Sequence, residues 1–357
     1  MLWIIGVGIS GYKGISIATL EILKNCDRAY IETFTSSLSD KDLEELSALI
    51  RIKSSNYDTL IPVQRWFVED GREIIEQSQH ENVALLTYGD PLIATTFTEL
   101  RIRAIKRSVG VKVIHAASGI TSLIGESGLH SYKFGRTVTM MSGFHSYFTV
   151  YATILDNLLA SNHTLILTEY SKSNDKLFFL DPKYFFEKML QAEDDIKYGA
   201  FSFETFAIVV SRIGMEDQQL ESGRVRSLID KDYGVGPHSI IIPASLHFTE
   251  LEAVKTLSLN FDEPIDNTVN MKKISVKMIE NYAPKAREAA IQLKSVIKGE
   301  NKFLLTHQSV EILDNAECYI DDAERFLKQG KYELAVLSMG YAEGLIDALR
   351  MQRERPM

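Results

Sequence analysis

The sequence has few residues of the kinds that disulfide-stapled, metal-binding or membrane proteins need. Only two of its 357 residues are cysteines, Cys26 and Cys318, and neither lies in a CxxC or Cys/His pattern, so neither a disulfide framework nor a zinc site is supported. The acidic groups at 193–195 and 321–322 lack the spacing of metal ligands, and we expect no metal.

No apolar run approaches the roughly 20 residues of a membrane span. The apolar start, Met1–Ile5, is too short for a signal peptide and lacks its basic flank. We therefore expect a cytoplasmic protein without a membrane partner. The formal net charge of −9 argues against nucleic acid as a partner, because neutralising phosphates requires a basic surface. The length allows two or three domains, and a composition of 45% hydrophobic and 24% charged residues is that of an ordinary soluble chain.

Four short loops dominate what the sequence does contain. Three of them follow short apolar runs that we predict to be buried strands, Leu2–Ile5, Val83–Thr87 and Val111–Ile114. Loops at the carboxyl ends of parallel strands converge on one crevice, so we expect a cofactor site there. The four loops are Gly6-Val7-Gly8-Ile9, Tyr88-Gly89-Asp90-Pro91, His115-Ala116-Ala117-Ser118 and Gly236-Pro237-His238.

The pattern changes twice along the chain. Residues 1–135 alternate short strands with amphipathic segments, as parallel βα units do. A new series of strands and helices occupies 136–262, and a polar, proline-containing linker follows at 263–270. From 271 to 357 only helical periodicity remains, which predicts a small bundle. Other predicted helices are 43–49, 66–75, 96–105, 148–160, 182–191 and 248–258, and other predicted strands are 29–32, 137–141, 164–168, 206–211 and 239–242.

Two of the loops favour different chemistries. Gly6-x-Gly8-x-x-Gly11, with Glu32 about 20 residues on, matches a dinucleotide fingerprint and leaves a nicotinamide-dependent oxidoreductase open. Against this, the apolar helical face begins only at Ile15, so the glycines do not open directly onto a helix N-terminus that could hold a pyrophosphate. Asp90 follows a buried strand in a Gly-Asp-Pro turn and is predicted to face a ligand, although the turn could instead precede a helix capped by Thr95.

The histidines and serines of these loops give no nucleophile. His115 and His238 each adjoin an apolar strand and are interpreted as structural. Ser10 and Ser118 lack the G-x-S-x-G setting of a nucleophile elbow, which makes serine hydrolysis a poor hypothesis. The sequence therefore identifies no catalytic residue.

Residues 1 to about 262 resemble the diphthine synthases, the methyltransferases of diphthamide biosynthesis within the tetrapyrrole methylase superfamily. The resemblance rests on an ordered series of motifs across the whole two-domain length, which is more specific than one glycine loop. The motifs are Leu2–Ile9, Ile31–Ser36, Gly89–Thr96, Ile114–Ser118, Gly128–Gly135 and Gly236–His238. The tail from about 270 resembles a small uncharacterised helical domain of archaeal proteins, so the chain is interpreted as an archaeal-type fusion.

The resemblance implies two α/β domains with S-adenosyl-L-methionine in the cleft between them, usually in a homodimer. It implies that the substrate is elongation factor 2, whose histidine carries a 3-amino-3-carboxypropyl group with an amine to be methylated. The implied cofactor contacts are Ile9, Asp90, Ile93, Ser118, Gly119, Thr168, Ile213 and His238.

The chain departs from the family pattern at several positions. Tyr88 stands where a proline commonly precedes the Gly-Asp-Pro turn, Phe97 where a histidine is usual, and Gly119 and Thr168 replace larger apolar residues. Two other functions stay open beside diphthine synthase and the oxidoreductase. One is methylation of a tetrapyrrole such as a precorrin on the same fold. The other is a binding module in which the helical tail recruits a partner and the methylase part is inactive.

Overall fold

The computed structural model describes residues 1–34, 38–50, 60–143, 146–173, 176–269, 271, 273–298 and 303–354. The chain forms two compact units, Met1–Asn270 and Met271–Met357, and each is described by itself. Thr35 and Ser36, the last residues of one motif quoted above, lie outside the described residues. No helix in the described ranges is long and apolar enough to cross a membrane.

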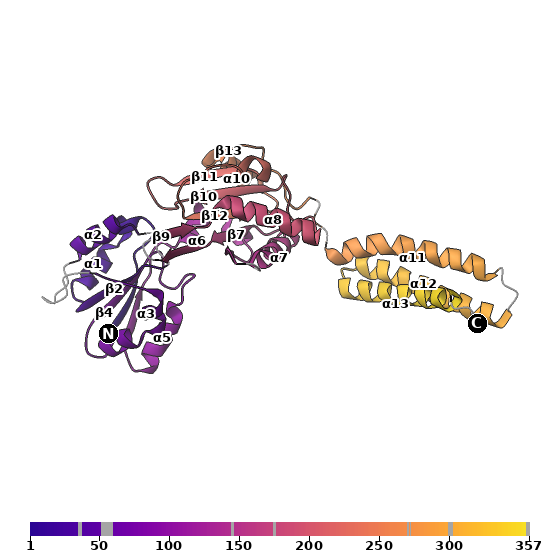
Figure 1. Ribbon diagram of the computed structural model, residues 1–357, viewed down its shortest axis with the longest axis horizontal. Coiled ribbons are helices and arrows are strands. Elements are labelled where there is room, and N and C mark those ends of the chain that lie inside the picture. Colours follow the sequence, from indigo (N-terminus) through magenta and orange to yellow (C-terminus); the bar gives the residue numbers. More distant parts are fainter. Residues whose placement is uncertain are drawn as a thin grey trace. The chain divides into compact units, whose positions relative to one another are not determined.

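The first lobe of the larger unit is a parallel five-stranded sheet in the order β3-β2-β4-β1-β5. Residues alternate between its faces: Leu2 and Ile4 of β1 pack into one apolar cluster, and Ile5 packs into the other. Helices α1 and α2 cover one face and α3 and α5 the other (Figure 1). Burial on both faces explains why these strands are continuously apolar. The strands are β1 (Leu2–Gly6), β2 (Arg28–Glu32), β3 (Ile61–Val63), β4 (Val83–Thr87) and β5 (Val111–Ile114).

The helices of the first lobe confirm most of the predicted segments, with one correction. The predicted helix at 66–75 is two helices, because Gly71 between them adopts a left-handed φ of 57° that ends α3. The bounds are η1 (Gly11–Gly14), α1 (Ile17–Leu23), α2 (Asp40–Leu49), α3 (Arg65–Asp70), α4 (Arg72–Ser78), α5 (Phe97–Lys106), α6 (Gly119–Glu126) and η2 (Ser131–Lys133).

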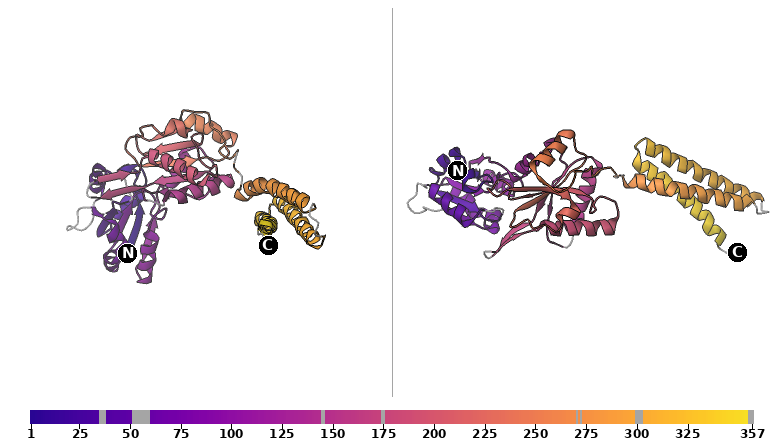
Figure 2. Two further views of the ribbon diagram at one scale, coloured as in Figure 1. Left: turned by 45° about the vertical axis from the view of Figure 1, so that its right-hand side comes forward. Right: turned by 90° about the horizontal axis from the view of Figure 1, so that it is seen from above.

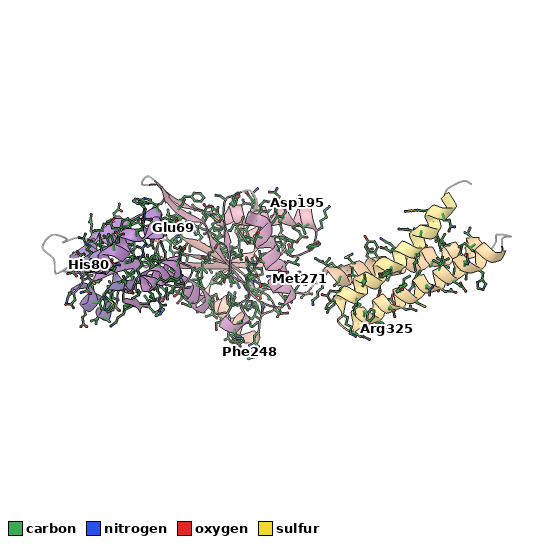
Figure 3. All side chains as sticks on the ribbon, turned by 90° about the horizontal axis from the view of Figure 1, so that it is seen from below. Glu69, His80, Asp195, Phe248, Met271 and Arg325 are labelled. Carbon is green, nitrogen blue, oxygen red and sulfur yellow. The ribbon has the colours of Figure 1, made fainter. Side chains whose placement is uncertain are left out.

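The second lobe is a mixed six-stranded sheet in the order β13-β11-β10-β12-β7-β6. Its central strand pairs are antiparallel, whereas β6–β7 and β11–β13 are parallel. Phe248, the first residue of α10, projects from the surface with 71% of its area exposed (Figure 3). The sheet strands are β6 (Val138–Met140), β7 (Thr164–Thr168), β10 (Phe206–Ser211), β11 (Gln219–Arg224), β12 (His238–Ile242) and β13 (Leu259–Asn260). The remaining elements are α7 (Ser146–Leu159), α8 (Pro182–Ile196), α9 (Val225–Leu228), α10 (Phe248–Leu257) and the hairpin of β8 (Tyr170–Ser173) and β9 (Lys176–Phe179).

The smaller unit is a bundle of three long helices, α11 (Ile274–Lys298), α12 (Phe303–Lys328) and α13 (Tyr332–Glu354) (Figures 1 and 2). Each helix contributes buried alanines to its core, among them Ala290, Ala316 and Ala342. Small side chains let helix backbones approach closely. The predicted helical periodicity of this segment is confirmed.

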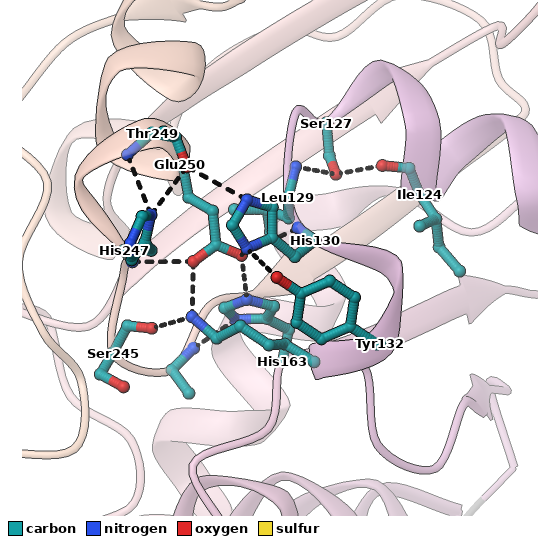
Figure 4. Close-up of polar contacts among 12 residues, drawn as sticks. Ile124, Ser127, Leu129, His130, Tyr132, His163, Ser245, His247, Thr249 and Glu250 are labelled. Atoms are coloured by element: carbon teal, nitrogen blue, oxygen red, sulfur yellow. Dashed lines mark hydrogen bonds and ion pairs between the residues drawn. The ribbon is translucent and has the colours of Figure 1, made fainter.

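A buried carboxylate fixes the segment that joins α6 to β6. Glu250 of α10 is fully buried and accepts hydrogen bonds from the Lys133 ammonium (2.5 Å), the His163 ring (3.0 Å) and the backbone N–H of His130 and His247 (both 2.8 Å), as Figure 4 shows. The other ring nitrogen of His163 accepts from the Ala244 N–H, so its Nε2 carries the proton given to Glu250. The network ties residues 130–133 to the second lobe.

The same contacts keep Glu250 ionised. Burial by itself raises the pKa of the Glu250 carboxyl, but the hydrogen bonds from Lys133, the two backbone amides and His163 outweigh it and lower the pKa from 4.5 to about 2. Burial lowers the pKa of His163, which stays neutral at pH 7. A charged carboxylate and a neutral imidazole are thus the stable states.

We predict that Glu250→Ala destabilises the larger unit by roughly 3–5 kcal/mol, because it leaves two amides and the His163 ring without their acceptor and the Lys133 ammonium without its carboxylate partner. Urea denaturation at pH 7, followed by tryptophan fluorescence and circular dichroism, measures the effect. Glu252→Ala, an exposed change on the same helix, is the matched control and should be nearly neutral.

The pH dependence of the free energy of unfolding distinguishes the contribution of the Glu250 charge from that of its packing. Because the folded pKa of Glu250 lies below 4.5, its ionisation stabilises the fold fully above about pH 4.5 and less as the pH falls toward 2. The stability difference between the wild type and Glu250→Gln should therefore shrink over that window. A constant difference would contradict the electrostatic account.

Candidate functional site

A cavity of about 220 Å³ lies where the loop ends of the first lobe meet strands of the second. The loop after β4, the start of α6, the end of β7 and the start of β12 all contribute to its wall. Its lining residues are Tyr88, Gly89, Asp90, Ile93, Ala94, Thr95, Ser118, Gly119, Ile120, Leu123, Leu167, Thr168, Tyr170, Phe179, Ile213, Pro237, His238 and Ser239. We call it the first cavity.

Seven of the eight predicted contact residues line this cavity. They are Asp90, Ile93, Ser118, Gly119, Thr168, Ile213 and His238. The eighth, Ile9, is not among the lining residues; it is buried, and its backbone oxygen accepts a 2.7 Å hydrogen bond from the Tyr88 hydroxyl. The structure thus brings together residues from five separate parts of the chain.

The geometry of Gly6 explains how the loops come so close. A Cβ at Gly6 would lie 2.5 Å from the Gly89 carbonyl oxygen and 2.9 Å from the Ala116 Cβ. Just beyond, Gly8 and Gly89 exchange backbone hydrogen bonds of 3.3 and 2.8 Å. Any side chain at Gly6 would push the three loops apart, so the glycine is a packing requirement.

The Asp90 carboxylate links the loop after β4 to the loop after β5. Its Oδ1 accepts from the Leu92 N–H at 2.9 Å, and its Oδ2 lies 2.8 Å from His115 Nδ1 and accepts from the Ala116 N–H at 3.2 Å. A carboxylate offers about four acceptor positions, so these contacts leave room for one further donor. Asp90 is only 6% exposed, and these contacts join the two loops at the cavity wall.

His115 and His238 have different surroundings. His115 pairs with Asp90 and is largely exposed, whereas His238 is buried, and its Nδ1 lies 2.9 Å from the Ser211 hydroxyl. Burial lowers the pKa of His238, so its ring is neutral at pH 7. The Ser211 hydroxyl is itself buried and does not line the cavity, so this pair offers no exposed nucleophile.

His238 enters the site at the start of a strand, as the predicted strand at 239–242 implies. The second-lobe strand β12 is antiparallel to β7 and begins at His238, so the loop 236–238 precedes its strand instead of following one. The Thr168 hydroxyl, at the end of β7, donates a 2.7 Å hydrogen bond to the His238 carbonyl. The mixed sheet therefore brings one strand start and one strand end to the same wall.

Sequence reasoning missed the hairpin of β8 and β9. Tyr170 and Phe179 lie at paired positions in it, with ring centroids 5.2 Å apart, and both line the cavity. The local signal was weak, because a polar Ser-Asn-Asp sequence precedes Lys176–Phe179 but Tyr170–Ser173 shows no alternation of apolar and polar residues. Aromatic rings from the second lobe thus form part of the wall.

Ala94 is another lining residue that the motif analysis did not single out. Its φ of 56° is left-handed, which is unfavourable for a residue with a Cβ. The surrounding loop therefore holds the backbone in a shape that local preference does not supply, as is common at binding sites.

The dinucleotide interpretation finds no support in the geometry. Glu32, the expected ribose-binding acid, is fully buried and accepts from the Thr87 hydroxyl and the Phe34 N–H, and it is absent from the cavity wall. The glycine loop runs into the short η1, and α1 begins only at Ile17. No α-helix begins directly after the glycines, so the N-terminus that would hold a pyrophosphate is missing there.

The chemistry of the wall suits a ligand that is partly apolar and carries a few polar groups. Leu123, Leu167 and Ile213 provide apolar surface, and Asp90 and several backbone groups provide hydrogen bonds. Within the described ranges, no group of three or more His, Cys, Asp or Glu residues has a metal-binding arrangement. The site can position a ligand and exclude water around it.

Comparison with known proteins places the chain in a family. The family described as Tetrapyrrole (Corrin/Porphyrin) Methylases matches residues 1–229, and one described as Protein of unknown function (DUF357) matches residues 281–353. A diphthine synthase of Methanothermobacter thermautotrophicus is 35% identical over 254 residues, which is 71% of this chain and 93% of that protein. A diphthine synthase of Methanocaldococcus jannaschii is 33% identical over 263 residues, 73% of this chain and all of that protein.

A solved structure from Entamoeba histolytica that is assigned to diphthine synthase superposes with a TM-score of 0.65 at 29% identity, covering 73% of this chain and 99% of that one. The sequence and structural matches agree, and together they confirm the predicted fold of two α/β domains followed by helices. The chain therefore belongs to the tetrapyrrole methylases and, within them, to the diphthine synthases, and it is a methyltransferase.

Proposed function

We propose that this protein transfers methyl groups from S-adenosyl-L-methionine to the amine of the 3-amino-3-carboxypropyl-histidine of elongation factor 2, in diphthamide biosynthesis. The observation that carries the proposal is the match to diphthine synthases over 93–100% of their own length. The tetrapyrrole alternative has no such support among these relatives, and the buried Glu32 argues against a nicotinamide enzyme.

The residues that line the first cavity support binding of the methyl donor there. Its polar wall at Asp90, Ser118 and His238 suits the donor's amino acid and ribose groups, and its apolar wall suits the adenine. At Gly119 a Cβ would meet no protein atom within 4 Å, so the wall there is open toward the cavity. When bound, the cofactor supplies a methyl group on a sulfonium, which is reactive enough to need no metal.

The chain's own task is positioning. An amine like an α-amino group has a pKa of about 8, so removing its proton at pH 7 costs only about 1.4 kcal/mol. No strong base is needed, so neither Asp90 nor His238, which line the cavity, is assigned that task. Holding the unprotonated nitrogen in line and keeping water away are therefore the main contributions of the protein. No catalytic side chain is assigned.

The proposal also covers the domain organisation, the oligomeric state and the partners of the protein. We propose that residues 1–135 and 136–262 are the two methylase domains, 263–270 the linker and 271–357 an accessory helical domain. A separate sheet in each lobe supports the first division. We also propose a cytoplasmic homodimer that binds neither nucleic acid nor membranes, with elongation factor 2 as its protein partner.

The direct test incubates the full chain with S-adenosyl-L-methionine and elongation factor 2 that carries the 3-amino-3-carboxypropyl group. Mass spectrometry of the modified peptide should show the added mass of one or more methyl groups on that histidine. Unmodified elongation factor 2 is the control. Methyl transfer to a precorrin but not to the peptide would contradict the proposal.

We predict that Asp90→Ala weakens binding of S-adenosyl-L-methionine by about tenfold to a hundredfold, because losing hydrogen bonds to a buried carboxylate costs roughly 1.5–3 kcal/mol. Isothermal titration calorimetry measures the change. Asp156→Ala, at an exposed helix position, is the control and should bind normally. Unchanged affinity in Asp90→Ala would refute the role given to this residue.

Removing residues 271–357 should leave methyl transfer intact. The relatives are matched over almost their whole length by the part of the chain outside the bundle, and residues 1–270 form a compact unit. The measurement compares turnover of the truncated and full chains on the same substrate. Loss of turnover with normal cofactor binding would instead make the bundle part of substrate recognition.

A further inference from the structure

A second cavity, of about 400 Å³, lies beside the first. Its wall combines η1, the start of α2 and a loop of the second lobe at 214–216. The lining residues are Ser10, Gly11, Tyr12, Lys13, Leu38, Ser39, Lys41, Asp42, Tyr88, Gly214, Met215 and Glu216.

One side chain is common to the walls of the two cavities. Tyr88 lines both, and its hydroxyl is fixed to the Ile9 carbonyl by a 2.7 Å hydrogen bond. On the opposite lobe, Ile213 lines the first cavity and its neighbour Gly214 lines the second. Gly214 lets its loop pack closely against Ile9, because a Cβ at position 214 would lie 2.5 Å from Ile9 Cγ1. A group bound in the second cavity is therefore adjacent to a ligand in the first.

The second cavity differs from the first in its charge. Two lysines, Lys13 and Lys41, and two acids, Asp42 and Glu216, line it. Lys13 pairs with Glu216 across the lobes at 2.7 Å, with side chains 61% and 89% exposed. The hydrogen bond from Lys13 and its positive charge lower the pKa of Glu216, and the charge of Lys41 acts in the same direction. An exposed pair of this kind is readily exchanged for a ligand.

The two acids are not equivalent. Asp42 is engaged in capping α2: its Oδ2 accepts from the Ser39 N–H at 3.1 Å and the Ser39 hydroxyl at 2.6 Å, and its Oδ1 from the Tyr12 N–H at 3.4 Å. Lys41 forms no ion pair with any of the described residues. The cavity thus offers the ammonium of Lys41, which has no ion-pair partner among the described residues. It also offers the ammonium of Lys13, whose exposed partner Glu216 can be displaced.

These charges complement an amino-acid-like group, which carries a carboxylate and an amine on one carbon. We propose that the second cavity binds the methyl acceptor, a protein side chain ending in such a group, with its carboxylate held by Lys13 and Lys41. The inference rests on the proposed function, which supplies the chemistry of the acceptor. Binding the carboxylate displaces Glu216 from Lys13. The amine on the same carbon then faces Tyr88 and the first cavity.

Kinetics with the intact chain test the assignment. The variants are Lys13→Gln and Lys41→Gln, which remove the charge at similar size, and Lys41→Arg, which keeps it. Lys24→Gln, an exposed change at the end of α1, is the matched control. KM is measured for elongation factor 2 carrying the 3-amino-3-carboxypropyl group, and calorimetry measures S-adenosyl-L-methionine binding to each variant.

We expect each Gln variant to raise KM for the acceptor about fivefold or more, with cofactor affinity and kcat near the wild-type values. Lys41→Arg should recover most of the loss, and Lys24→Gln should match the wild type. Unchanged KM in both Gln variants would overturn the inference, as would a loss of cofactor binding in both. If the wild type itself failed to methylate the acceptor while binding the cofactor, the proposed function would fail instead.

Discussion

The site depends on one buried carboxylate. Asp90 joins the loops after β4 and β5 through contacts with Leu92, His115 and Ala116, and Gly6 allows those loops to meet without a side chain between them. Parallel strands bring their loops to one edge, but only such cross-links fix the loops within hydrogen-bonding distance. The shape of the first cavity on its first-lobe side follows from this link, and the second lobe closes the wall with Thr168, His238 and the β8–β9 hairpin.

The two cavities divide the work of a transfer reaction. The first is lined largely by apolar groups and backbone, which suits a cofactor recognised by shape and a few hydrogen bonds. The second is lined by the exposed charges of Lys13, Lys41 and Glu216. Methyl transfer to an amine asks for proximity and an unprotonated nitrogen, and neither requires a covalent intermediate. Adjacent cavities that share Tyr88 in their walls meet the need for proximity.

Much of the first-lobe fold and of the first cavity could be predicted from the sequence. The glycine loops and the Gly-Asp-Pro turn follow apolar strands closely, so their convergence follows from the geometry of parallel sheets. The pairing of His115 with Asp90 could not be predicted from the sequence, because each residue alone allows a structural interpretation. The break at Gly71, the order of the mixed second sheet and the Lys13–Glu216 pair, which spans 203 residues, depend on tertiary contacts that local patterns do not encode.

A crystal structure of the full chain soaked with S-adenosyl-L-methionine tests the central claim most directly. The account predicts the donor in the first cavity, against the Asp90 loop, Ser118 and His238, with its methyl group directed past Tyr88 toward the second cavity. Density for the donor confined to the second cavity, or at a surface away from both, would contradict it.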